Sequence, residues 1–187
     1  MSQQTIYYKL TDQDNETRNC TRWGENVTHK ALNMQEGDRM LCSAYWIHVY
    51  DSPEIAVIMN PMHANVRNPR IWECECKGLS KNDKGLKRGF KEVQTIKEIE
   101  LPNISLEQKI TFAIKCAMVV YKENDFLEWA NKWLSGEDRS EQSAIKIRKS
   151  IASGKANNYA AYSAVSAASY PADIDGEAAA SAADSAD

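Results

Sequence analysis

Hydrophobic and polar positions alternate in two segments of the first hundred residues, and this spacing predicts two strands. In residues 41–50, alternation places Trp46, His48 and Tyr50 on one face of the strand. In residues 71–77, a tryptophan and two cysteines share one face, and two glutamates share the other. Strands of this kind are typical of an antiparallel sheet with one face toward a core.

Helix start signals follow the first of these strands and dominate the second half of the chain. Ser52 followed by Pro53 is typical of a helix N-terminus, because serine caps backbone amides and proline fits the first turn. Ser105 opens a capping box ahead of another helix, and apolar spacing predicts two more helices within residues 125–153. We therefore predict an α+β fold with a small, mainly antiparallel sheet and a C-terminal helical layer.

The composition changes near Gly154. Alanine and serine dominate residues 154–187, and the larger apolar residues there are too sparse to form a core of their own. We predict one α+β domain over residues 1–153, followed by a low-complexity tail over residues 154–187 that is partly helical or disordered. Residues 178–184, which are mostly alanine, are expected to be disordered.

The chain has 187 residues with a net charge of −3, and 43% of them are hydrophobic, as in an ordinary globular protein. It contains no run of about 18 apolar residues, and its polar first residues lack a secretory signal. We therefore expect a cytoplasmic protein without a membrane partner. Residues 77–97 are basic, but Phe90 is their only aromatic residue, so a nucleic-acid partner is not expected.

The five cysteines are odd in number and lack the paired Cys-x-x-Cys spacing of zinc sites, so we expect reduced thiols and no metal. The glycine-rich signatures of P-loop and Rossmann proteins are absent, as are the Gly-x-Ser-x-Gly of hydrolases and the His-Glu-x-x-His of zinc proteases. The motifs therefore indicate no cofactor.

The most distinctive candidate site is the strip of Trp46, His48 and Tyr50, which runs directly into the helix that Ser52 opens. Helix N-termini attract anions and aromatic faces stack on bases, so this arrangement is typical of a nucleotide pocket. The alternative is structural, with both aromatic residues in the core and the histidine held by a hydrogen bond. His63, in the turn region after the helix, could reach the same cleft.

Two further groups of charged residues are candidates for function. Arg18 and Arg22, beside Trp23, could clamp a phosphate or a carboxylate, or they could lie in a solvated loop. Glu73 and Glu75 share a strand face, where they could supply a general acid or base, or could simply face solvent.

A longer stretch joins the strip to the helix, and it reads Trp46-Ile-His-Val-Tyr-Asp-Ser-Pro-Glu-Ile-Ala-Val-Ile-Met-Asn-Pro-Met-His-Ala-Asn, with Asn68-Pro-Arg-Ile-Trp-Glu after it. This stretch resembles an uncharacterised family encoded by phages and prophages. The likeness covers about residues 5–140, and members of the family often end in alanine-rich tails. The family has no function to carry over, but its phage context and the absence of a catalytic signature lead us to expect an accessory protein that acts by binding. Its expected role is to antagonise a host defence or regulatory factor, either a host protein or a small nucleotide signal.

The layout from Trp46 to Ala56 carries a weaker likeness, to ADP-ribosyltransferase-like folds. That likeness implies an enzyme that uses NAD. His48 and its aromatic neighbours would line the nicotinamide pocket, and Glu73 or Glu75 would orient the ribose 2′-hydroxyl. A third interpretation is a structural or virion-associated protein that forms homo-oligomers through its alanine-rich tail.

Overall fold

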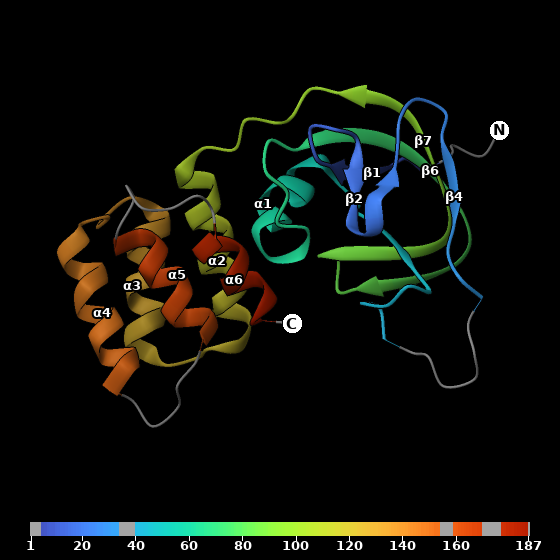
Figure 1. The fold of residues 1–187 in the computed structure, drawn as a ribbon. Coiled ribbons are helices and arrows are strands. Elements are labelled where there is room, and N and C mark those ends of the chain that lie inside the picture. The colour runs from blue at the N-terminus through green and yellow to red at the C-terminus, as the bar shows by residue number, and fades with distance from the viewer. Residues whose placement is uncertain (1–4, 34–39, 154–158, 170–176, 187) are drawn as a thin grey trace. The chain divides into compact units, whose positions relative to one another are not determined.

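The computed structural model describes residues 5–33, 40–153, 159–169 and 177–186 (Figure 1). The chain divides into two units, Met1–Asn103 with the sheet and Ile104–Asp187 with the C-terminal helices. The predicted α+β class, with a mainly antiparallel sheet, is confirmed. The division falls at residue 103, whereas composition alone predicted a boundary near residue 154, so the predicted domain over residues 1–153 spans parts of both units.

The sheet of the N-terminal unit is antiparallel in all its described pairings. Its strands are β1 (Tyr7–Thr11), β4 (Thr28–Lys30), β5 (Ile47–Val49), β6 (Arg70–Asp83) and β7 (Lys87–Ile99). The long strands β6 and β7 pair with each other in the middle (Figure 1). β1 pairs with the other edge of β6, whereas β4 and β5 both pair with the other edge of β7. β5 and β6 lie where alternation predicts strands.

Tyr8 and Tyr50 join the two ends of this sheet. The backbone amide of Tyr8 donates to the carbonyl of Tyr50 at 2.9 Å, and the reverse hydrogen bond is 2.8 Å. Because β1 also pairs with β6, and β5 with β7, this bridge closes the sheet on itself. One buried cluster of this unit consists of Trp23, Val49, Trp72, Cys74, Phe90 and Val93.

A short segment before β4 covers part of this cluster. β2 (Glu16–Thr17) and β3 (Thr21–Arg22) form a small hairpin around a 3₁₀ turn at Arg18–Cys20. Trp23 follows the hairpin directly, and its indole Nε1 donates a hydrogen bond to the Thr17 hydroxyl at 3.0 Å. This bond satisfies the polar atom of the indole and holds the ring in place.

Helix α1 (Pro53–His63) begins as the sequence predicts. The Ser52 hydroxyl accepts a hydrogen bond from the Ile55 amide at 3.2 Å, and Pro53 occupies the first turn. Ala56 and Met59 are fully buried, and the helix packs beside β1. α1 therefore covers the sheet near the bridge that closes it.

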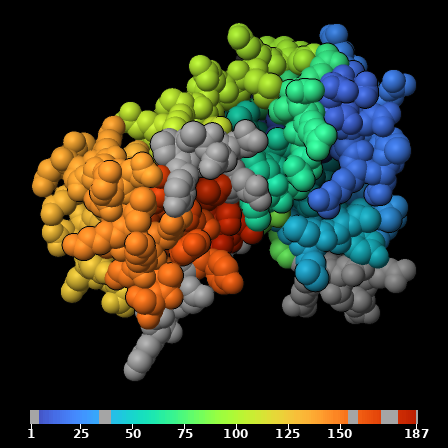
Figure 2. Space-filling model, turned by 60° about the vertical axis from the view of Figure 1, so that its left-hand side comes forward, coloured from blue at the N-terminus to red at the C-terminus, as the bar shows by residue number. Residues whose placement is uncertain are grey.

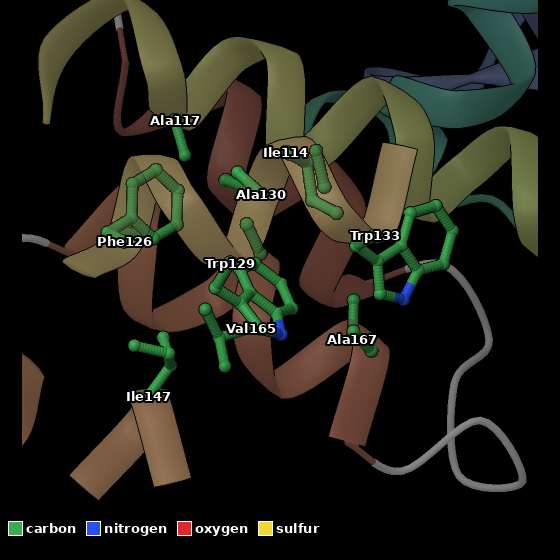
Figure 3. Close-up of a cluster of buried hydrophobic side chains, with 14 of the residues drawn as sticks. Ile114, Ala117, Phe126, Trp129, Ala130, Trp133, Ile147, Val165 and Ala167 are labelled. Atoms are coloured by element: carbon green, nitrogen blue, oxygen red, sulfur yellow. The ribbon is translucent and has the colours of Figure 1, made fainter. Parts of the chain in front are cut away.

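The C-terminal unit is a bundle of helices. Its described members are α2 (Leu106–Val120), α3 (Asn124–Ser135), α4 (Glu141–Ser153), α5 (Tyr159–Ser169) and α6 (Glu177–Asp184). The predicted capping box is present at the start of α2. Large side chains such as Phe126, Trp129 and Trp133 fill the core together with the small residues of α5 (Figure 3). None of the helices described has the length and apolar character that a membrane crossing needs.

The alanine-rich segment packs into this bundle. α5 contacts α2, α4 and α6, and α4 lies beside α5 in the space-filling view (Figure 2). Alanine has no long side chain to hold helices apart, so the neighbouring helices supply the apolar surface that the segment lacks. α6 forms where the sequence predicted disorder, whereas the parts of the predicted tail at residues 154–158 and 170–176 lie outside the described residues.

Candidate anion-binding site

Lys9 is buried within the closed sheet. It lies in the middle of β1, opposite Trp72 of β6, and is only 7% exposed. Its Nζ donates a hydrogen bond to the backbone oxygen of His48 at 3.1 Å and lies 4.5 Å from the centroid of the Trp23 ring. Within the described residues, no carboxylate forms an ion pair with Lys9. A carbonyl oxygen and an aromatic face are its partners.

Burial lowers the pKa of Lys9 from 10.5 to about 8, because a charged amine loses its hydration inside the protein. The thiols of Cys74 and Cys76 on β6 are the titratable groups that act on this amine. Burial raises the pKa of Cys74 to about 12 and also raises the pKa of Cys76, so both thiols are neutral near pH 7. A buried amine without a negative partner is costly, and perturbed groups of this kind gather at functional sites.

His48 lies among positive charges. Its Nε2 donates a hydrogen bond to the backbone oxygen of Leu41 at 2.7 Å, which orients the ring. Burial is the main cause that lowers the pKa of His48, and the charges of Lys9, Lys87 and Arg18 lower it further. In the described part of the chain, every charge that acts on this imidazole is positive. These positive charges favour the neutral form of the imidazole.

Two of these three cations have no carboxylate partner among the described residues. Lys87 does have one, since its Nζ lies 3.3 Å from a carboxylate oxygen of Asp83, and it also donates to the Cys42 Sγ at 3.2 Å. Arg18 is exposed in the 3₁₀ turn and makes no ion pair within the described segments. Lys9 and Arg18 therefore contribute positive charge that the described residues do not neutralise.

The other two residues of the predicted N-terminal group have different surroundings from Arg18. Trp23 is buried, with Lys9 over its ring and the His29 ring edge-on to it at 4.5 Å. The indole is thus a cover over Lys9 and offers no open face on which a base could stack. Arg22 is exposed in β3, and its backbone oxygen accepts a hydrogen bond from His29 Nε2 at 2.8 Å.

The strip of Trp46, His48 and Tyr50 is divided among three environments. Trp46 is buried, with the Lys91 Nζ 4.5 Å from the centroid of its ring. Tyr50 is also buried and stacks on His63, with ring centroids 6.0 Å apart and planes inclined by 15°. The structure therefore places His63 with Tyr50. Trp46 and Tyr50 are therefore buried residues, as the structural alternative predicts. His48 is the residue of the strip whose pKa the positive charges lower.

Glu73 and Glu75 are not among the groups that shift the pKa of Lys9 or of His48. Glu73 pairs across the sheet with Tyr8 and forms an ion pair with Lys97 of β7 at 3.4 Å. Glu75 lies two residues further along β6, beyond the end of β1. Neither carboxylate is among the groups that lower the pKa of His48. The arrangement that the ADP-ribosyltransferase likeness implies, a glutamate beside the aromatic strip, rests on the sequence alone.

Reasoning from the sequence did not single out Lys9. The available signal is one lysine between apolar residues in the segment Tyr7–Thr11, where Thr11 is also fully buried. Alternation along the strand indicates which residues share a side with Lys9. Alternation does not indicate that the Lys9 side chain is buried. Its burial results from the closure of the sheet, which the bridge between Tyr8 and Tyr50 completes.

No group of three or more histidine, cysteine, aspartate or glutamate side chains is arranged to hold a metal ion within the described residues. Comparison with protein-family models, curated proteins and solved structures finds no match to this chain.

Proposed function

We propose that the N-terminal unit binds a small anionic ligand beside His48, and that the ligand is a phosphate-bearing nucleotide signal. One observation carries this proposal: Lys9 is buried beside the His48 backbone and forms no ion pair with a carboxylate among the described residues. The positive charges of Lys9, Lys87 and Arg18, which lower the pKa of His48, support it. Arginine and lysine bind phosphate through charge-assisted hydrogen bonds, and partial burial strengthens such contacts.

The hydrogen bonds of this site support binding rather than catalysis. Nucleophilic catalysis needs a nucleophile in contact with a base. Here, Lys9 donates to the backbone oxygen of His48, and His48 Nε2 donates to the backbone oxygen of Leu41. Backbone partners of this kind hold charged side chains in position without activating them.

A binding role agrees with the accessory function expected from the phage context and from the absence of a catalytic signature. A protein that holds a nucleotide signal lowers its free concentration and so antagonises the host factor that responds to it. Such a protein needs a preformed charged site and no catalytic group. The resemblance supports this biological setting, and the charges around His48 support the chemistry.

A thermal-shift screen tests the proposal. The purified protein is mixed with NAD, ADP-ribose, ATP and cyclic dinucleotides, and adenosine is the matched ligand without phosphate. A binding ligand at a hundredfold excess over its Kd should stabilise the N-terminal unit by about 2.7 kcal/mol. Adenosine should produce no shift.

Two arginines of the same segment provide the matched variants. Arg18→Gln should reduce the shift, because it removes one of the charges that act on His48. Arg22→Gln should leave the shift unchanged, since Arg22 is exposed and is not among those charges. The proposal is wrong if no phosphate-bearing ligand stabilises the protein, or if adenosine does so equally well.

A further inference from the structure

Cys42 and Lys87 form a contact that anion binding does not require. Cys42 is exposed, and the Lys87 Nζ donates a hydrogen bond to its Sγ at 3.2 Å. We infer that Cys42 is a site of oxidation by hydroperoxides, at which the Lys87 ammonium group donates the proton that the leaving oxygen needs. Hydrogen peroxide is small enough to reach an exposed thiol without a cavity.

The backbone next to Cys42 is held against strand β7. The Leu41 carbonyl accepts a hydrogen bond from His48 Nε2 at 2.7 Å. The Leu41 side chain is only 8% exposed and packs on Gly89 of β7, two residues from Lys87. Because glycine has no side chain, this segment lies close to β7, and the Cys42 sulfur reaches the lysine.

The Lys87 ammonium group keeps its proton although the residue is only 8% exposed. Burial lowers the pKa of Lys87, but its contacts with Cys42 and with the Asp83 carboxylate outweigh that effect and raise the pKa above 10.5. The Lys87 Nζ lies 3.3 Å from an Asp83 oxygen, so the ammonium group is held between the carboxylate and the sulfur. A charged hydrogen-bond donor is thus fixed beside an exposed thiol.

The oxidation requires a nucleophile and a proton donor at the same point. The Cys42 thiolate attacks one oxygen of hydrogen peroxide, so an S–O bond forms while the O–O bond breaks. The sulfur loses two electrons and the peroxide gains them. The departing hydroxide takes a proton from the Lys87 ammonium group and leaves as water. The neutral amine then takes up the proton that the thiol released, so the thiol and hydrogen peroxide give a sulfenic acid and water.

The other cysteines lack this combination of access and proton donor. Cys20 is exposed beside the 3₁₀ turn, but its sulfur has no hydrogen-bond partner among the described residues. Cys74, Cys76 and Cys116 are buried or half-buried, and burial raises the pKa of each thiol, so little thiolate is present. Cys42 is the exposed thiol with a cationic donor in contact.

Site-resolved oxidation of the full-length protein measures this reactivity. Reduced protein is treated with hydrogen peroxide at about pH 7.5, the sulfenic acid is trapped with dimedone, and peptide mass spectrometry follows Cys42 and Cys20 in the same molecules. The rate at each cysteine is divided by its rate with iodoacetamide, whose iodide leaves without a proton. This ratio removes differences in exposure and thiolate content, and it should be about tenfold higher at Cys42 than at Cys20.

Two lysine variants assign the proton donor. Lys87→Gln should lower the ratio at Cys42 to about that of Cys20, because an amide does not release a proton to hydroxide. Lys97→Gln is the matched control, since Lys97 is an exposed lysine of the same strand that also pairs with one carboxylate, that of Glu73. It should leave the ratio at Cys42 unchanged. Slow alkylation of the buried Cys74 shows that each variant is folded.

The outcomes either support or overturn the inference. A higher ratio at Cys42 that Lys87→Gln removes and Lys97→Gln retains supports it. Equal ratios at Cys42 and Cys20 in the wild-type protein overturn it, and this comparison stays decisive even if Lys87→Gln does not fold. A high ratio that persists in folded Lys87→Gln overturns the role of the ammonium group.

Discussion

The Nζ of Lys9 donates a hydrogen bond to the backbone oxygen of His48 at 3.1 Å, across 39 positions of sequence. The two residues lie in β1 and β5, the strands that the bridge between Tyr8 and Tyr50 brings together. Closing the sheet therefore buries the amine and places it next to the histidine. This contact links the fold of the N-terminal unit to its candidate site.

Lys9→Met should stabilise the protein at neutral pH. A shift in pKa from 10.5 to about 8 corresponds to a cost of about 3 kcal/mol for the charged amine, and methionine avoids that cost at a similar length. Loss of the hydrogen bond to His48 offsets about 1 kcal/mol, so we expect a net gain of about 2 kcal/mol. Urea unfolding at about pH 7 measures this difference, and a loss of stability would contradict it.

The free-energy cost of burying Lys9 should also depend on pH, and it should decrease as the pH rises. Its pKa is lower in the folded protein, so the unfolded chain binds more protons between about pH 8 and pH 10.5. The penalty is fully present below pH 8 and disappears as the pH rises through this window. Unfolding free energies of the wild-type protein and Lys9→Met should therefore converge from pH 8 to pH 10.5, and a constant difference would argue against a buried cation.

Gly89→Ala should destabilise the N-terminal unit by about 1–3 kcal/mol. A Cβ at Gly89 would lie 2.6 Å from the Leu41 Cδ1 and 2.9 Å from the Trp46 Cβ, and the tryptophan Cβ is too close to the backbone to move aside. Gly24→Ala is the matched control, because its Cβ would meet the Val27 Cγ2 at an ordinary 3.6 Å. Equal effects of the two substitutions in urea unfolding would count against this packing.

Ala164→Leu tests whether α5 belongs to the helical bundle. Ala164 is fully buried, so the larger side chain should overpack the core and cost about 1–3 kcal/mol. Tyr159→Ala, at a residue of the same helix that is 71% exposed, should change stability by less than about 0.5 kcal/mol. If Ala164→Leu has no effect on thermal unfolding, the segment is not packed in the folded protein.

The five thiols should react at two different rates. Cys20 and Cys42 are exposed, whereas burial raises the pKa of Cys74 to about 12 and of Cys116 to about 11. The thiolate is the reactive form, so the exposed pair in the native protein at about pH 8 should react with Ellman's reagent in a fast phase, each thiol forming a mixed disulfide and releasing one thionitrobenzoate. Cys20→Ser with Cys42→Ser should abolish that phase, and a surviving fast phase would show that a buried thiol is accessible.

The sequence by itself determined the local elements of this protein. Ser52 with Pro53 and the capping box at Ser105 each define a helix start through contacts with residues only a few positions away. Alternation likewise predicted the strands around His48 and Trp72. These signals are readable because they depend on backbone periodicity and near neighbours.

Only the tertiary structure decided which of these residues meet. The bridge between Tyr8 and Tyr50 encloses Lys9, and packing against α2 and α4 turns the alanine-rich α5 into part of a core. Both outcomes depend on residues far apart in the chain, whose contacts arise only when apolar surface is buried on folding. Lys9 and the alanine-rich α5 look like surface residues in the sequence. Both are buried because distant parts of the chain pack against them.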